Sequence, residues 1–169
     1  MAAQEIIIYG DPVLREVAEP VEKVDQAVKD LVSMMVDTLK KAHGLGLAAP
    51  QVGVSKRVFI VDLSAIDITA ELHIFINPEI IWTSENDVEL EEGCLSFPGI
   101  YQRIVRPSRV RVRALGLDGK PFEMEAGGMA ARAILHEYDH LEGVLFIDHI
   151  SPIARTLLKG RLKKLAAAS

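Results

Sequence analysis

The stretch that decides the fold is His136-Glu137-Tyr138-Asp139-His140. On a helix, residues four apart lie on the same face, so both imidazoles can reach one metal ion. Glu137, next to the first histidine, can then reach a water held at that metal and serve as general base. We therefore expect a helix here whose inward face carries a hydrolytic metal centre.

The residues around this motif predict a helix from Met129 to Leu141, closed by Gly143. Upstream, the chain is rich in Val and Ile and broken by Pro and Gly pairs, which is typical of strands. Asp118-Gly119 predicts a hairpin that returns the chain through residues 121–124. The predicted strands before this hairpin are Arg57–Leu63, Leu72–Thr83, Val88–Glu91 and Val105–Leu117.

Two further helices are expected near the ends of the chain. Apolar residues at spacings of three and four predict one from Val24 to His43, with Gly44 at its C-terminal cap. The other runs from about Pro152 to Ala168. The order is helix, strands and helix, so we expect an α+β fold. Mostly antiparallel strands would pack around a central helix that carries the His-Glu-x-x-His motif, within a single domain over residues 1–169.

The composition excludes several classes of protein. A net charge of −5 over 169 residues gives no general affinity for nucleic acid or anionic membrane. No apolar run approaches the roughly 20 residues that cross a bilayer, so we expect no membrane partner. The first nine residues do not resemble a secretion signal, and the single cysteine, Cys94, favours a reducing compartment. We therefore expect a cytoplasmic protein.

The motif does not identify the third metal ligand. Catalytic metals take about three protein ligands and leave one position open. Glu142, Asp148 and His149 follow the helix too closely to be comfortable candidates. Cys94 is the better candidate, because it lies where a strand gives way to a Gly/Pro turn. A buried structural cysteine would be the ordinary interpretation of that residue without the helix motif.

A third segment, Gly44 to Gly53, is rich in small residues and contains one amide, Gln51. Small residues let a backbone pass close to a ligand, so we expect Gly44, Leu45 and Gly46 beside a substrate. Gln51 would supply an uncharged hydrogen-bond donor. A tight connection between helix and strand explains the glycines alone but not the whole segment.

Taken together, three segments resemble the signatures of the peptide deformylase family. They are Gly-x-Gly-x-Ala-Ala-x-Gln at Gly44 to Gln51, Glu-Gly-Cys-Leu-Ser at Glu92 to Ser96, and His-Glu-x-x-His at His136 to His140. All three occur in order and with family-like intervals. The resemblance implies a hydrolase that removes the formyl group from the N-terminal formylmethionine of nascent polypeptides and releases formate.

The resemblance also implies a role for each matching residue. Cys94, His136 and His140 would hold one divalent metal, and a water bound to it would attack the formyl carbon. Glu137 would take the proton of that water and return it to the departing amine. The Gln51 amide and the backbone N–H of Leu95 would stabilise the oxyanion.

The metal and the methionine pocket are less constrained. One thiolate and two imidazoles suit Fe²⁺, Zn²⁺, Ni²⁺ or Co²⁺; the resemblance implies Fe²⁺, with the others as substitutes. Met129 and Ala133 lie two turns and one turn before His136, so with Leu45 and Leu90 they would line an apolar pocket. Arg132 departs from such a lining unless its stem packs there and its charged end reaches water.

Two hypotheses concern charged residues outside these signatures. We expect Asp139 to pair with an arginine such as Arg106 and to fix the helix against the sheet. The last helix carries basic residues that would dock on the ribosome, or else form a solvated face: Arg155, Lys159, Arg161, Lys163 and Lys164.

Two rival functions stay open at this point. One is a zinc peptidase that uses the same helix motif with a third ligand other than Cys94. The other is a binding module that keeps the fold without turnover, although Glu137 gives this no support.

Overall fold

The computed structural model describes residues 2–67 and 69–169. Within these residues the helices are α1 (Gln26–Ala42), α2 (Gly128–Leu141) and α3 (Pro152–Ala167). The strands are β1 (Gly46–Ala48), β2 (Val58–Asp62), β3 (Leu72–Thr83), β4 (Asp87–Gly93), β5 (Tyr101–Pro107), β6 (Arg109–Leu115) and β7 (Pro121–Gly127). Short 3-10 helices join them: η1 (Pro12–Arg15), η2 (Ala49–Val52), η3 (Leu63–Ala65) and η4 (Phe146–His149).

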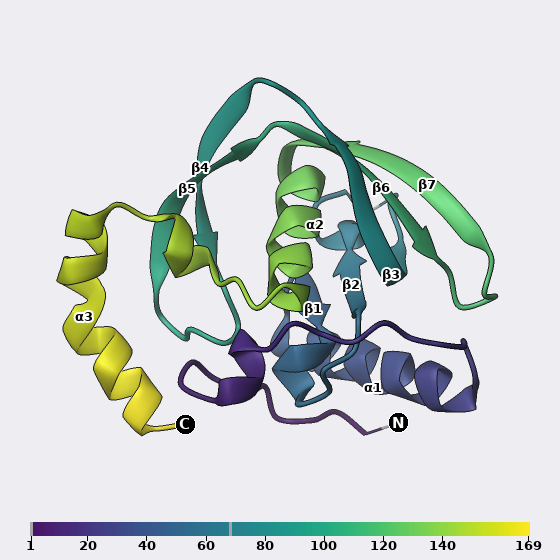
Figure 1. Ribbon diagram of the computed structural model, residues 1–169, viewed down its shortest axis with the longest axis horizontal. Coiled ribbons are helices and arrows are strands. Elements are labelled where there is room, and N and C mark those ends of the chain that lie inside the picture. Colours follow the sequence, from purple (N-terminus) through teal and green to yellow (C-terminus); the bar gives the residue numbers. More distant parts are fainter. Residues whose placement is uncertain (1, 68) are drawn as a thin grey trace.

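The described strands form two separate antiparallel sheets (Figure 1). One is five-stranded, in the order β1-β2-β3-β6-β7, and the other is the β4-β5 hairpin. Helix α2 lies at the centre of the molecule, between the two sheets, and α3 lies beyond β5 (Figure 1). The expected α+β fold of antiparallel strands around a central helix is confirmed.

Strand β2 is buried on both faces, which explains its uninterrupted run of apolar residues. Phe59 and Val61 belong to the core that α2 covers. Val58 and Ile60 point the other way, into the core that α1 covers. A third core lies under α3, where Leu158 packs with residues of the turn after β4, of β5 and of η4. Helix α2 is therefore supported by a sheet that a second helix backs.

The predicted helices agree with the structure to within two residues at each end, but the cap of α1 was assigned to the wrong residue. His43, and not Gly44, adopts the left-handed conformation, with φ of 56°, and its N–H bonds the carbonyls of Leu39 and Lys40. Gly44 is small for another reason, since a Cβ there would lie 2.7 Å from Leu95 Cδ1.

The predicted strand over Val105–Leu117 is also wrong, because it is two strands in different sheets. The break falls at Ser108, whose N–H donates to the Asn86 carbonyl and not to a ladder. The chain leaves the β4-β5 hairpin there and enters the larger sheet at β6. The hairpin at Asp118-Gly119 is confirmed, with Gly119 at a φ of 75° between β6 and β7. No helix in the described part of the chain is long and apolar enough to cross a membrane.

Candidate metal centre and cleft

Helix α2 directs His136, Glu137 and His140 into the interior of the molecule. Their exposed fractions are 8%, 5% and 1%, although all three side chains are polar. The two imidazole rings of His136 and His140 lie edge to face with centroids 5.3 Å apart, neighbours as the spacing of four residues predicts. Burying three polar side chains on one face of a helix costs free energy unless a polar or charged partner lies between them.

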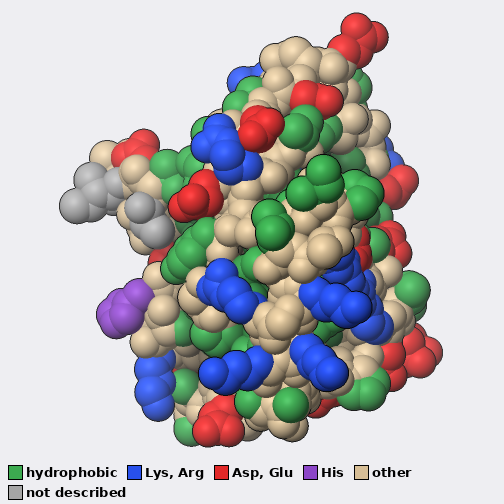
Figure 2. Space-filling model, turned by 90° about the vertical axis from the view of Figure 1, so that its left-hand side faces the viewer, with side chains coloured by type: hydrophobic (Ala, Val, Ile, Leu, Met, Phe, Trp, Pro, Cys, Tyr) green, Lys and Arg blue, Asp and Glu red, His purple; other side chains and the backbone are tan. Residues whose placement is uncertain are grey.

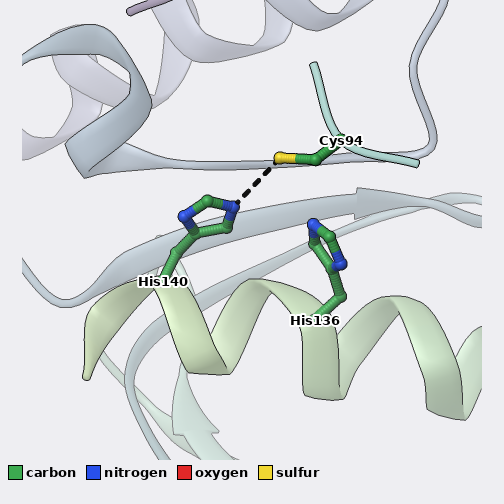
Figure 3. Close-up of side chains that lie close together, drawn as sticks. All are labelled: Cys94, His136 and His140. Carbon is green, nitrogen blue, oxygen red and sulfur yellow. Dashed lines mark hydrogen bonds between the residues drawn. The ribbon is translucent and has the colours of Figure 1, made fainter. Parts of the chain in front are cut away.

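Cys94 reaches the same point from the end of β4. Its Sγ lies 3.4 Å from Nε2 of His140, and one ligand atom from each of Cys94, His136 and His140 lies within 4.8 Å of the others. Figure 3 shows the thiol above the helix with both imidazoles turned toward it. The structure therefore brings together the three residues that the sequence analysis proposed as metal ligands.

The three donors fit a tetrahedral metal ion. Ligands at the usual 2.0–2.3 Å from such an ion lie about 3.5 Å from one another, close to the observed separation of thiol and imidazole. Burial lowers the pKa of His140 well below its usual value and so favours its neutral form, whereas for His136 burial is outweighed by bonds to Cys94 and Glu92, which raise its pKa. Among the described residues, Glu137 Oε1 and His140 Nδ1 are buried without a hydrogen-bond partner. Both unsatisfied atoms belong to this site.

The other three candidates for the third ligand are engaged elsewhere. Glu142 pairs with Arg57 at 3.2 Å, and Asp148 pairs with Arg15 at 2.6 Å. His149 lies 2.9 Å from Asp139. These contacts remove the geometric basis for a peptidase-like site with a ligand downstream of α2.

Glu92 is the functional residue that the sequence analysis missed. Its Oε1 accepts from Nδ1 of His136 at 2.9 Å, and the residue is 6% exposed. Burial alone would raise the pKa of Glu92, but hydrogen bonds from His136 and Arg106 lower it to about 2. Strand alternation could have found it, because Leu90 and Glu92 share one face of β4 whereas Glu91 lies on the other.

The expected ion pair between Asp139 and Arg106 is confirmed at 2.9 Å. Arg106 also donates two hydrogen bonds to Glu92, from Nε to Oε2 at 2.5 Å and from Nη2 to Oε1 at 3.0 Å. One guanidinium therefore connects α2 to β4 from its position on β5. Arg132 does depart from an apolar lining: it lies in the wall of the cleft, but its charged end is buried and not in water, and its Nη1 donates to Glu92 at 2.5 Å.

Gln51, on η2, lies beside Cys94. It is 1% exposed, and its Oε1 accepts from the backbone N–H of Ala48 at 3.0 Å. This bond aims Nε2 at Ser96 Oγ and Cys94 Sγ, at 3.1 and 3.7 Å. The amide is thus fixed with its donor end toward the thiol.

A cleft of about 300 Å³ opens onto this cluster. Its walls include all but one of the residues expected to line a substrate pocket, together with Gln51, Leu95 and Glu137: Gly44, Leu45, Gly46, Met129 and Ala133. Met129 is 40% exposed at the mouth, and Ala133 is 5% exposed inside. Burial raises the pKa of Glu137 to about 7, which suits a group that accepts and returns a proton.

Leu90 is the exception. Of the residues that the structure describes, β4 contributes Glu91, Glu92 and Gly93 to the cleft, but not Leu90. Leu90 pairs with Ile104 at a point two residues, or about 7 Å, farther from Cys94 than Glu92 lies. Its placement in the pocket is therefore corrected.

Comparisons with known proteins agree on one family. The sequence profile of the family described as polypeptide deformylase matches residues 3–156. The chain is 48% identical over 168 residues to peptide deformylase 1 of Burkholderia multivorans, covering 99% of this chain and 92% of that protein. It is 45% identical over 169 residues to the peptide deformylase of Phenylobacterium zucineum, covering all of both.

Solved structures give the same result. A peptide deformylase from Legionella pneumophila superposes with a TM-score of 0.90 at 41% identity, covering 99% of this chain and 97% of that one. A peptide deformylase from Synechococcus elongatus in complex with actinonin has a TM-score of 0.88 at 37% identity, covering 95% and 89%.

Proposed function

This chain belongs to the polypeptide deformylase family, and from that membership we propose how its own residues carry out the reaction. It is a hydrolase that removes the formyl group from the N-terminal formylmethionine of nascent polypeptides and releases formate. The family is metal-dependent, and the cluster of Cys94, His136 and His140 is its metal-binding site here. A divalent ion there supplies Lewis-acid activation of water near neutral pH. The proposed catalytic unit is one domain over residues 1–169.

Glu137 is the general base and acid of the proposed mechanism. It takes a proton from the attacking water as the C–O bond forms at the formyl carbon. It then gives that proton to the amine nitrogen as the C–N bond breaks, so that formate and a free N-terminus leave. Its unpartnered Oε1 beside the two histidines is the observation that carries this assignment.

Gln51 and the backbone N–H of Leu95 are the proposed oxyanion donors. The Gln51 amide is already oriented by Ala48 and Ser96, so it needs no rearrangement when charge develops on the formyl oxygen. Loss of one such donor costs on the order of 3 kcal/mol of transition-state stabilisation. The methionine side chain would lie between Leu45, Met129 and Ala133, which line the cleft.

The test of this function is formate release from formyl-Met-Ala-Ser by anaerobically purified protein. Turnover by the parent, and a loss of about 10²–10⁴-fold in kcat for Glu137→Ala with metal retained, would support the roles given. A folded, iron-loaded parent without turnover would refute them.

The native metal in this proposal is Fe²⁺, with Zn²⁺, Ni²⁺ and Co²⁺ as substitutes. The donor set of one thiolate and two imidazoles accepts all four ions, and the choice of Fe²⁺ rests on the family to which the chain belongs. Metal analysis of protein purified without oxygen, followed by the loss of activity in air, would test the assignment to Fe²⁺.

A second proposal concerns location and partners: the enzyme works in the cytoplasm and docks on ribosomal RNA through α3. Figure 2 shows the face that α3 forms, with Lys and Arg side chains gathered on its lower half. Lys159, Lys163 and Lys164 are exposed on α3, and none of them takes part in an ion pair among the described residues. A basic patch on an otherwise acidic protein favours a polyanionic partner.

Truncation of α3 would not test the docking proposal, because Leu158 and Leu162 are buried in the third core. Charge reversal of Lys159, Lys163 and Lys164 to Glu keeps that core intact. Co-sedimentation with ribosomes should fall for this variant. The matched control reverses three exposed lysines of α1, at positions 29, 40 and 41, and should bind as the parent does. Equal binding by both variants would refute the proposal.

A further inference from the structure

Arg132 occupies an unusual position one turn before His136 on α2. It is 4% exposed, so its guanidinium is buried with its charge. Its Nη1 donates to Glu92 Oε2 at 2.5 Å and to the Ile104 carbonyl at 2.9 Å. Its Nη2 donates to the Val88 carbonyl at 2.7 Å. One side chain on the ligand helix therefore holds both strands of the separate β4-β5 hairpin.

Glu92 is the point at which these contacts meet the metal ligands. Arg132 and Arg106 both bond Oε2 at 2.5 Å, the first from α2 and the second from β5. The other oxygen, Oε1, accepts from Nη2 of Arg106 at 3.0 Å and from Nδ1 of His136 at 2.9 Å. Two guanidinium groups on different elements thus fix the plane of the carboxylate.

The orientation of that plane matters because it determines how His136 presents its ring. A histidine that donates from Nδ1 to a carboxylate keeps its lone pair on Nε2 and holds the ring in one orientation. In this protein Nε2 is the nitrogen left to converge with Cys94 and His140. The angle of the carboxylate therefore decides where this donor points.

We propose that Arg132 is a positioning residue for the metal ligand His136 and acts through Glu92. This inference rests on the metal centre of the proposed function. Arg106 alone cannot fix Glu92 in the same way, because it is also drawn toward Asp139 by a 2.9 Å ion pair. Arg132 also donates to two backbone carbonyls of the hairpin, which hold its guanidinium in place, so its bond to Glu92 has a fixed origin.

The experiment measures metal release and not turnover. Cobalt-substituted enzyme is mixed with excess EDTA, and the visible absorption of the cobalt–thiolate centre is followed as the ion leaves. Substitutions next to a metal ligand typically change affinity or activity by 10- to 100-fold. Arg132→Met keeps an unbranched stem but removes the guanidinium, and it should release cobalt about 10-fold faster than the parent.

Two comparisons separate positioning from general destabilisation. Arg15→Met removes another guanidinium, more exposed than that of Arg132, which bonds the carboxylate of Asp148 and the carbonyl of Gly143. None of these three residues lines the cleft. This control should release cobalt at the parental rate. In a Glu92→Gln background, Arg132→Met should add less than about a 2-fold change, because its path to His136 is already cut.

Parental cobalt release by Arg132→Met, or its full effect in the Glu92→Gln background, would overturn the proposal. If Arg132→Met does not fold, Arg132→Lys is used instead. A single ammonium group cannot reach all three acceptors, so this variant should also release cobalt faster than the parent. Release at the parental rate would contradict the proposal. Because no substrate is present, the result stands apart from the formate assay, and failure of one does not imply failure of the other.

Discussion

A Cβ atom placed on Gly46 would lie 2.8 Å from Oε2 of Glu137 and 3.0 Å from its Cγ. The backbone of β1 is thus one wall of the space that holds this carboxylate. The side chain has no room to retreat from the two histidines, and its position depends on the absence of a side chain at residue 46.

Gly46→Ala should therefore lower kcat by about 100-fold, the usual cost of displacing a catalytic group by about 1 Å. The metal content should not change, because no ligand contacts residue 46. The measurement is kcat and KM for formyl-Met-Ala-Ser, together with metal analysis. Gly160→Ala is the control, since a Cβ at that helical position meets nothing within 4 Å. A parental kcat in Gly46→Ala would show that the carboxylate tolerates the shift.

Cys94→Ala should lose most of its bound metal, because two imidazoles alone leave the site one ligand short. The measurement is metal content after dialysis, compared with circular dichroism to establish that the fold is kept. His149→Ala, which removes a rival candidate ligand, should keep the parental content. The opposite pattern would revive the peptidase hypothesis.

Asp139→Asn should lower the free energy of unfolding by about 1.5–3 kcal/mol, the typical contribution of a hydrogen bond to a charged group. The substitution weakens the ion pair between Asp139 on α2 and Arg106, whose side chain is only 5% exposed. Urea unfolding would measure the change. Glu123→Gln affects a more exposed pair 3.8 Å apart on the sheet surface and should stay within about 0.5 kcal/mol of the parent. Unchanged stability and metal content in Asp139→Asn would exclude a fixing role.

The pH dependence of stability should report the ion pairs of Asp148. Burial would raise the pKa of this carboxyl, but hydrogen bonds from Arg15 and from the backbone of Leu145 outweigh burial and lower it below its usual 3.8. A depressed folded pKa stabilises the protein above pH 3.8, and this contribution is lost as the pH falls through the folded value.

Asp148→Asn should accordingly be less stable than the parent by a constant amount at pH 5–7. The difference should shrink as the pH falls below about 4. Urea midpoints measured in parallel from pH 3 to pH 7 would give this difference directly. A gap that persisted undiminished at pH 3 would contradict the assignment.

Local patterns in the sequence predicted most of the fold. The His-Glu-x-x-His motif placed α2, and the Asp118-Gly119 turn placed the β6-β7 hairpin, because both features are determined by neighbouring residues. The division of residues 105–117 between two sheets could not be predicted in this way. It depends on the bond from Ser108 to Asn86, which joins residues distant in sequence.

The site shows the same limit. Cys94 could be proposed from chemistry, since it is the single thiol of the chain. The roles of Glu92 and Arg132 were not predicted, because a buried carboxylate and a buried guanidinium look like surface residues until their partner is known. Arg132 is tolerated inside because it pairs with Glu92, and Glu92 because it pairs with both Arg132 and Arg106. Such pairs are properties of the packed structure and not of either segment.

The metal ligands are divided between the end of β4 and α2, and this division has a consequence for the synthesis of the chain on the ribosome. Cys94 precedes His136 by 42 residues (136 − 94). At usual rates of synthesis, about 5–20 residues per second, the thiol is made roughly 2–8 s before the first imidazole. Glu92 is made just before that interval begins, and its partners on α2, Arg132 and His136, are made only at its end. No metal site exists on the growing chain, and the ion can be captured only after the helix has been made and has docked against the hairpin.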